Sequence, residues 1–190
     1  MTEKSDGNAD RPFLTDVKTL RERARRHIQD GAVTGTYGGD VETACKVLNA
    51  ALATEIVCVL RYKRHYFMAK GIHAGPVKSE FHEHAAEEQA HADRIAERIV
   101  QLGGSPDFSP AGLLSRSHSE YVEGTTLIDM ITEDLVAERI AIDSYREIAT
   151  YFADFDTTPR KMIEEIQASE EEHADDLAEL LERLPRGEAS

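Results

Sequence analysis

A short stretch of this chain occurs twice, and each copy carries a carboxylate and an imidazole at helical spacing. Residues 86–99 read AEEQAHADRIAERI, and residues 168–181 read ASEEEHADDLAELL. Both contain Glu-x-x-His, and positions i and i+3 of a helix share one face. The paired residues are Glu88 and His91 in the first copy, and Glu170 and His173 in the second. Such pairs, present in duplicate, are the parts of a metal site inside a helical bundle.

The repeat extends upstream of both copies. NAALATEIVCVLRY at 49–62 matches TEDLVAERIAIDSY at 132–145, which aligns a second pair of glutamates and a pair of tyrosines. The aligned pairs are Glu55 with Glu138, and Tyr62 with Tyr145. Each half of the chain therefore supplies a lone Glu followed by Glu-x-x-His. Together the halves offer four carboxylates and two imidazoles, which can surround two metal ions.

The ligand types narrow the chemistry of such a site. Carboxylate oxygen and imidazole nitrogen suit iron or manganese, and zinc less exclusively. The set contains no thiolate, which argues against an iron–sulfur or structural zinc centre. Two ions about 3.5–4 Å apart act on a shared small ligand. With iron, that ligand is dioxygen or hydrogen peroxide, and the reaction is oxidation of Fe(II).

The elements that must position these residues are helices. Ala, Glu, Leu, Ile and Arg are frequent, and these residues favour helix. Capping residues, glycines and prolines predict a short helix that Thr15 caps and Gly31 ends, then four long ones. The expected ranges are 16–29, 40–70, 76–102, 126–152 and 156–184. Short loops within each hairpin and one long link between them predict an all-α four-helix bundle with a single crossover connection.

The faces of the long helices provide an independent check. The repeated Glu and His residues fall on the apolar stripe of each helix and not on its polar face. Burying four carboxylates without a cation would be very costly, or would force them to hold protons. A bound pair of metal ions removes this difficulty.

Bulk properties exclude several classes of protein. The net charge of −14 argues against a main surface that binds nucleic acid. We expect no membrane-spanning run and no signal peptide. Cys45 and Cys58 lie about 20 Å apart along one expected helix, too far for a disulfide with each other. Reduced, buried thiols and a cytoplasmic location are the simplest interpretation.

These residues resemble the ferritin-like superfamily, and most closely bacterioferritin and the mini-ferritins related to it. The resemblance covers about residues 41–184, where ALATEIVCVLRY, EEQAHADRIAERI, DLVAERIAIDSYREI and EEEHADDLAELL are similar to the four bacterioferritin helices in order. It implies two terminal carboxylates, two bridging carboxylates and one histidine for each metal: Glu55 and Glu138, Glu88 and Glu170, and His91 and His173. Tyr62 matches the family's tyrosine beside the site and completes the expected catalytic set.

The resemblance also implies what the protein does. We expect a ferroxidase that holds two irons per subunit, with manganese or zinc as the alternatives, oxidises Fe(II) with dioxygen or hydrogen peroxide, and stores the ferric mineral in a shell. Gln89 stands where bacterioferritin has its haem-binding Met, so haem is not expected. Residues 174–190 leave little room for the fifth helix of the 24-subunit shell. A homo-oligomer of twelve is therefore favoured over twenty-four or two.

The chain divides by sequence into an arm with a short helix at 1–39 and the bundle at 40–185. The arm carries a basic island, for which packing on a neighbouring subunit is favoured over DNA contact; its residues are Lys18, Arg21, Arg23, Arg25, Arg26 and His27. Two other functions stay open. One is a peroxide-consuming enzyme like rubrerythrin or manganese catalase, and the other is a non-enzymatic, DNA-compacting, Dps-like protein.

Overall fold

The computed structural model describes residues 15–26, 28–29 and 31–184, and every regular element within these ranges is a helix. Contacts between residues divide the chain into two units, Met1–Tyr37 and Gly38–Ser190. The first unit holds α1 (Val17–Ala24), which buries none of its side chains. The second unit holds all the other helices and all the residues expected to bind metal.

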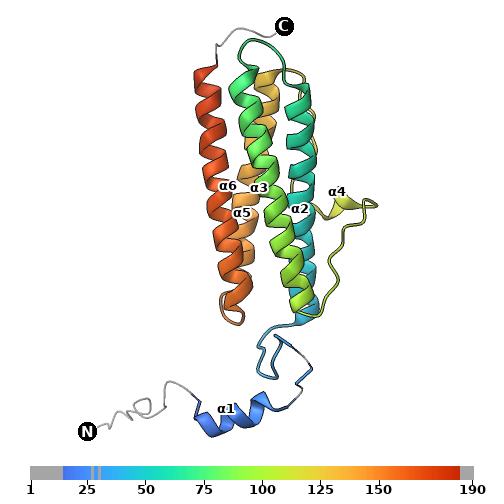
Figure 1. Ribbon diagram of the computed structural model, residues 1–190, viewed down its shortest axis with the longest axis vertical. Helices are drawn as coiled ribbons and strands as arrows, with labels where there is room; N and C mark the ends of the chain where they lie inside the picture. The colour runs from blue at the N-terminus through green and yellow to red at the C-terminus, as the bar shows by residue number, and fades with distance from the viewer. Residues whose placement is uncertain (1–14, 27, 30, 185–190) are drawn as a thin grey trace, which may run out of the picture. The chain divides into compact units, whose positions relative to one another are not determined.

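Four long helices form a bundle in the second unit: α2 (Val41–Met68), α3 (Ala74–Gln101), α5 (Leu127–Phe152) and α6 (Thr157–Arg183) (Figure 1). α2 packs most extensively on α3, and α5 on α6, so each half of the internal repeat is one helical hairpin. Contacts of α2 with α5 and of α3 with α6 join the two hairpins. The predicted four-helix bundle with one long crossover link is confirmed.

Side-chain caps fix where the long helices begin. Asp40 accepts a hydrogen bond from the Thr43 backbone N–H at 2.9 Å. Asp156 caps α6 in the same way. Thr126 and the third residue of α5, Asp129, bond each other's backbone N–H groups in a capping box. Each cap satisfies N–H groups that have no partner inside the helix, which is why these positions could be predicted.

Three predicted helix boundaries are wrong. The first helix begins after Asp16 and not Thr15, because the Asp16 carboxylate accepts the Thr19 backbone N–H at 3.0 Å. It ends at Ala24, short of the predicted 29; residues 27 and 30 lie outside the described ranges. The second long helix begins at Ala74, so Pro76 lies within its first turn, where a missing N–H costs nothing.

The crossover link, residues 102–126, runs along α2 and contains the short helix α4 (Leu113–Arg116), which the sequence did not predict (Figure 1). The Asn49 side chain donates to the Ser105 carbonyl at 3.2 Å and accepts the Asp107 N–H at 2.7 Å. Gly124 ends the link with φ +60°, and a Cβ there would lie 2.9 Å from the Met130 nitrogen. Hydrogen bonds along α2 thus hold the link against the bundle.

A buried ion pair also ties the link to both hairpins. Arg61 of α2 donates to the Asp134 carboxylate of α5 at 2.7 Å and to the Glu120 carbonyl of the link at 2.8 Å. His65 lies 2.8 Å from the other oxygen of Asp134 and 3.0 Å from the Glu123 carbonyl. The sequence offers no residue at partnered spacing for His65 and therefore predicts an exposed side chain, but His65 is fully buried.

The remaining sequence expectations of the fold concern thiols and membranes. Cys45 and Cys58 are free and buried, as predicted. α2 is long and apolar enough, by length and composition alone, to cross a membrane, so the expectation of no such run is too strong. However, 61% of its most apolar window is buried in the molecule. A core helix of a bundle requires this composition, because its neighbours cover most of its surface.

Replacing Asp134 with Ala should lower the free energy of unfolding by about 3–5 kcal/mol, because it leaves the Arg61 guanidinium buried without its carboxylate. Chemical denaturation at one fixed subunit concentration measures the change. The matched control is Glu165→Ala, which removes the exposed partner of Arg94 and should cost no more than about 1 kcal/mol. Equal, small losses in both variants would contradict a structural role for the buried pair.

Candidate metal centre

The six residues expected to bind metal lie together in the core of the bundle. Each of the four long helices contributes: Glu55 from α2, Glu88 and His91 from α3, Glu138 from α5, and Glu170 and His173 from α6. All six residues are buried, and the most exposed of them, His91, is only 5% accessible to solvent. The i, i+3 spacing brings Glu and His to one face of α3 and one face of α6, as predicted from the sequence.

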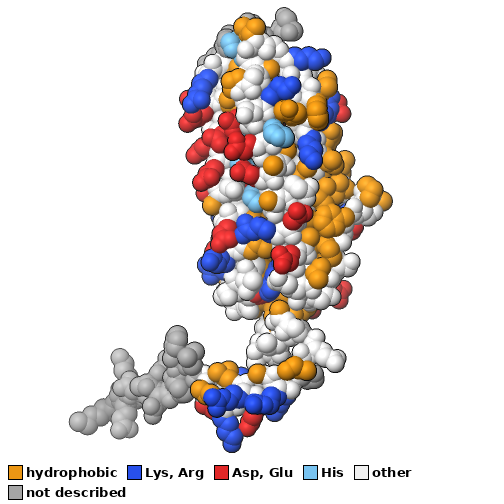
Figure 2. Space-filling model, in the orientation of Figure 1, with side chains coloured by type: hydrophobic (Ala, Val, Ile, Leu, Met, Phe, Trp, Pro, Cys, Tyr) orange, Lys and Arg blue, Asp and Glu red, His pale blue; other side chains and the backbone are white. Residues whose placement is uncertain are grey.

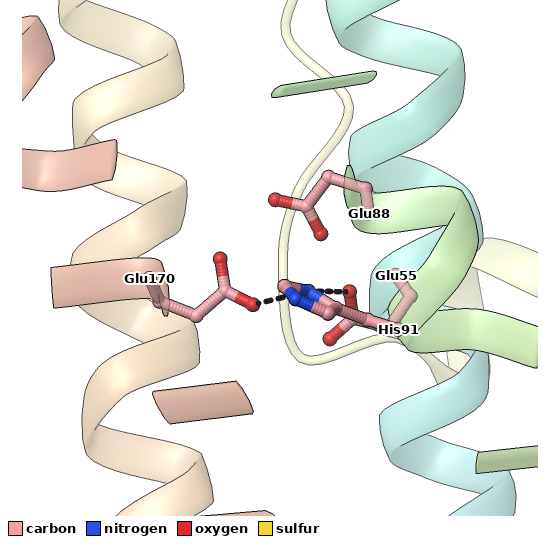
Figure 3. Close-up of side chains that lie close together, drawn as sticks. All are labelled: Glu55, Glu88, His91 and Glu170. Carbon is pink, nitrogen blue, oxygen red and sulfur yellow. Dashed lines mark ion pairs between the residues drawn. The ribbon is translucent and has the colours of Figure 1, made fainter. Parts of the chain in front are cut away.

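The donor atoms fall into two groups that share members. Glu55, Glu88, His91 and Glu170 form one group, in which all the contributing atoms lie within 4.8 Å of one another (Figure 3). His91 Nδ1 is 3.4 Å from Glu55 Oε2 and 3.1 Å from Glu170 Oε1. The second group consists of Glu88, Glu138, Glu170 and His173. Glu88 and Glu170 belong to both groups, which is the arrangement that carboxylates bridging two ions require.

Atoms without hydrogen-bond partners show that this cluster fits a pair of cations. Each of the six residues has at least one buried polar atom with no partner: Glu55 Oε2, Glu88 Oε1, His91 Nδ1, Glu138 Oε2, both carboxylate oxygens of Glu170, and His173 Nδ1. A buried polar atom without a partner costs on the order of 1–3 kcal/mol. Seven such atoms facing one another are therefore costly unless cations bind them. Hard oxygen donors and imidazole nitrogen suit iron or manganese.

An outer carboxylate orients one of the imidazoles. Glu87 Oε2 lies 2.6 Å from His173 Nε2, so this ring nitrogen donates its proton to Glu87 and leaves Nδ1 to face the bundle centre. Carboxylate partners of this kind fix the tautomer of metal-binding histidines. The sequence did not reveal this role of Glu87, because its partner lies 86 positions away.

Burial dominates the electrostatics of the four carboxylates. It raises the pKa of Glu55 and of Glu138 to about 7, and the pKa of Glu88 to about 8. The pKa of Glu170 is raised well above its ordinary value by burial and then by the charge of Glu88. The pKa of His173 is raised to about 9, because its carboxylate neighbours outweigh the effect of burial. Without cations, the core therefore holds protons that bound metal ions would displace.

Two buried tyrosines exchange hydrogen bonds between the hairpins. Tyr62 of the first hairpin donates to Glu138 of the second, and Tyr145 of the second donates to Glu55 of the first. Burial raises the pKa of both phenols well above 10, followed by the negative charge of Glu138 for Tyr62 and of Glu55 for Tyr145. Both phenols stay protonated and act as donors. The internal repeat explains the symmetry of these bonds, and the sequence alone did not reveal that they cross between hairpins.

Gln89, the residue that argues against haem binding in the sequence, has an exposed side chain on α3. Its amide donates to Asp93 at 3.0 Å. The side chain thus takes part in a surface hydrogen bond along its own helix.

Comparisons with known proteins find relatives over most of this chain. The family model described as ferritin-like domain matches residues 45–187. A bacterioferritin from Rhodobacter capsulatus is 31% identical over 129 residues, which cover 67% of this chain and 76% of that protein. A bacterioferritin from Mycobacterium tuberculosis is 28% identical over 142 residues, which cover 74% of this chain and 85% of that protein.

Solved structures give the same result. The dodecameric thioferritin of Bacteroides fragilis, a bacterioferritin-related protein, superposes with a TM-score of 0.72 at 34% identity and covers 75% of this chain and 86% of its own. The Dps protein of Thermosynechococcus elongatus has a TM-score of 0.72 at 24% identity, with 78% and 96% covered. The second similarity shows the shared fold.

Removing metal should make the stability of the protein depend on pH in a defined direction. Metal-free protein holds carboxyl protons with pKa values of about 7 to 8, above the value of 4.5 that applies to unfolded Glu. Its stability is therefore greatest when these protons are present and falls as pH rises through 7 and 8. The buried His84 and His91, whose pKa values are lowered chiefly by burial, are neutral in the folded protein and become neutral in the unfolded chain by about pH 7.5, so they offset only a small part of the loss.

Thermal unfolding of chelator-treated protein between about pH 6.5 and just above pH 8 measures this effect. The melting temperature should fall across the range for metal-free protein and stay nearly level for protein reloaded with metal. A metal-free protein whose melting temperature rises with pH would show that the buried carboxylates do not carry the expected protons.

Proposed function

The chain belongs to the family of ferritin-like domains, and from this premise we propose that it is a ferroxidase and iron-storage protein. In this proposal each subunit binds two Fe(II) ions within its own bundle, oxidises them with dioxygen or hydrogen peroxide, and passes the ferric product to a mineral. The main support is the pair of four-residue groups that share Glu88 and Glu170. Four carboxylates and two imidazoles, one imidazole for each group, match the ligand set of ferritin-like carboxylate proteins.

Each residue has a distinct task in the proposed reaction. A bound iron pair supplies one electron from each ion to the oxidant. Glu88 and Glu170 would each hold both ions, and His91 and His173 would each hold one. Glu55 and Glu138 are terminal ligands, and the hydrogen bonds from Tyr145 and Tyr62 fix one oxygen of each while the other stays free for metal. The proposed catalytic set also includes Tyr62, as expected from the sequence, because its hydroxyl donates to Glu138.

The predicted result of removing a ligand is the loss of rapid Fe(II) oxidation. Glu88→Ala and His91→Ala should each reduce the rate, followed by ferric absorbance after anaerobic Fe(II) loading and addition of oxidant, to that of iron without protein. The helical circular dichroism should not change, because each variant also removes a buried polar atom that has no hydrogen-bond partner. The matched control, Glu97→Ala, alters an exposed glutamate on the same helix and should oxidise iron at the native rate.

The same assay separates the alternatives. Oxygen release from hydrogen peroxide without ferric mineral would replace the proposal with a peroxide-consuming enzyme of the rubrerythrin or manganese-catalase type. Native rates in both ligand variants would overturn the site itself.

DNA contact is the less favoured role for α1, which carries basic side chains and no buried residue. Relatives named for DNA binding or protection include one from Synechococcus, which is 27% identical over 140 residues.

Exposed apolar side chains support assembly into a homo-oligomer. On α2 and the crossover link, they include Leu60, Phe67, Phe108 and Leu114, which are 48%, 72%, 52% and 58% exposed. Apolar side chains gather along the edge of the bundle that α2 and the link form (Figure 2). Apolar patches of this kind mark surfaces where proteins associate. The Bacteroides fragilis relative is a dodecamer, and twelve subunits is the assembly we propose.

Light scattering coupled to size-exclusion chromatography should therefore give about twelve times the subunit mass of 21.2 kDa. Phe67→Asp should shift the protein to smaller species, because a buried charge would weaken the apolar contact. Lys63→Asp alters an exposed position on the same helix and tests whether charge alone has this effect. A native mass of one or two subunits would contradict the proposed shell.

A further inference from the structure

Beside the six-residue cluster lies a third group of possible ligands. Glu80 and His84 come from α3, one turn apart, and Asp176 comes from α6. One donor atom from each residue lies within 4.8 Å of the others. The His84 side chain is 2% exposed, whereas Glu80 is 34% and Asp176 is 55% exposed. The group therefore extends from the buried core to the surface of the bundle.

Hydrogen bonding leaves one nitrogen of His84 without a partner. His84 Nδ1 lies 3.2 Å from the Tyr62 hydroxyl, and Tyr62 gives its single proton to Glu138. Since the Tyr62 oxygen can only accept from His84, Nδ1 carries the imidazole proton. Nε2 then presents its lone pair toward two carboxylates. A cation between these three electron-rich atoms would be bound by all of them.

The distances within the group differ from those of hydrogen bonds. His84 Nε2 lies 3.7 Å from Glu80 Oε2 and 3.7 Å from Asp176 Oδ2. Where a proton joins imidazole and carboxylate in this molecule, the separation is 2.6 Å for His173 and Glu87 and 2.8 Å for His65 and Asp134. Metal–ligand bonds of about 2.0–2.2 Å place neighbouring ligand atoms about 3–4 Å apart. The group has the spacing of ligands around an ion.

This third group is in direct contact with the six-residue cluster. The His84 and His173 rings stack with centroids 4.0 Å apart and planes inclined by 21°. Through Tyr62, His84 is also one hydrogen bond from Glu138. An ion held at the third group would therefore lie next to one half of the dinuclear centre.

The charge around the group favours cations. Partial burial raises the pKa of Glu80, and the negative charges of Asp176, Glu83 and Glu87 raise it further. Acidic side chains also gather over α3 and α6 on the face shown in Figure 2. Such a concentration of one sign of charge attracts and accumulates ions of the opposite sign.

The internal repeat shows that this feature occurs on one side only. With the repeat offset of 82 residues, Glu80 aligns with Met162, and His84 aligns with Ile166. Asp176 aligns with Arg94 of the first copy, which pairs with Glu165. The side of the centre that belongs to His91 thus has an apolar or cationic residue at each equivalent position. The third group is therefore not a by-product of the duplicated ligand motif.

We propose that Glu80, His84 and Asp176 form a third divalent-cation site that receives Fe(II) from solvent and passes it to the dinuclear centre from the side of His173. Binding of a cation there does not depend on the proposed function. The transfer of Fe(II) does rest on the proposed function.

Cobalt(II) binding tests the site without iron oxidation. Equilibrium dialysis of metal-free, full-length protein against Co(II) should give one ion per subunit beyond the pair, and anomalous diffraction should place it between the three side chains. The double variant E80Q/D176N keeps the shape of both side chains and should lose this ion while keeping the pair. The matched control E97Q/D175N removes two exposed carboxylates from the same helices and should bind as the native protein does. Unchanged Co(II) stoichiometry in E80Q/D176N, or no anomalous peak at the group, would overturn the site.

Stopped-flow oxidation at limiting Fe(II) tests the transfer. E80Q/D176N should fill the pair several-fold more slowly than E97Q/D175N and reach the same final amount of oxidised iron. A native rate in a variant that has lost the third Co(II) would overturn the transfer role. If no variant and no native protein oxidises iron, the proposed function fails, yet the Co(II) measurements still decide whether the third site exists.

Discussion

The structure depends on the cost of burying four carboxylates in the middle of a helical bundle. Burial is the largest cause that raises the pKa values of these groups, and their mutual repulsion adds to it. Each of the six candidate ligand residues has at least one buried polar atom without a hydrogen-bond partner. Apolar residues of similar volume would pack here at lower cost. The cluster is therefore suited to bind cations, and several surrounding groups keep its side chains in position.

Three of the six candidate ligands are held by hydrogen bonds from neighbouring residues. Glu87 fixes the ring of His173, and the two tyrosines each hold one oxygen of a terminal carboxylate. The pair Arg61 and Asp134 connects the hairpins and the crossover link away from the metal ligands. These bonds limit the movement of the helices, so the ligands keep their spacing even when the charges they carry repel one another.

Much of the fold and of the ligand set could be predicted from the sequence, because the information is local or repeated. Asp40 and Thr126 cap helices through residues three positions away, and Glu-x-x-His places two ligands on one face by spacing alone. The internal repeat then joined ligands that are far apart in sequence. What it could not reveal are contacts without repeat symmetry. With the offset of 83 residues, Asp134 aligns with Ala51, so nothing in the repeat indicated its ion pair. The repeat likewise offered no partner for His65, which was therefore wrongly predicted to be exposed.

The ligands of each metal group come from both hairpins, and so do the tyrosine hydrogen bonds that hold the terminal carboxylates. Neither hairpin can build half of the centre alone. Ions that bind only the docked arrangement shift the equilibrium toward it by mass action. If the proposed metal pair binds, it would therefore also stabilise the fold of this chain, because separating the two hairpins would require the loss of both ions.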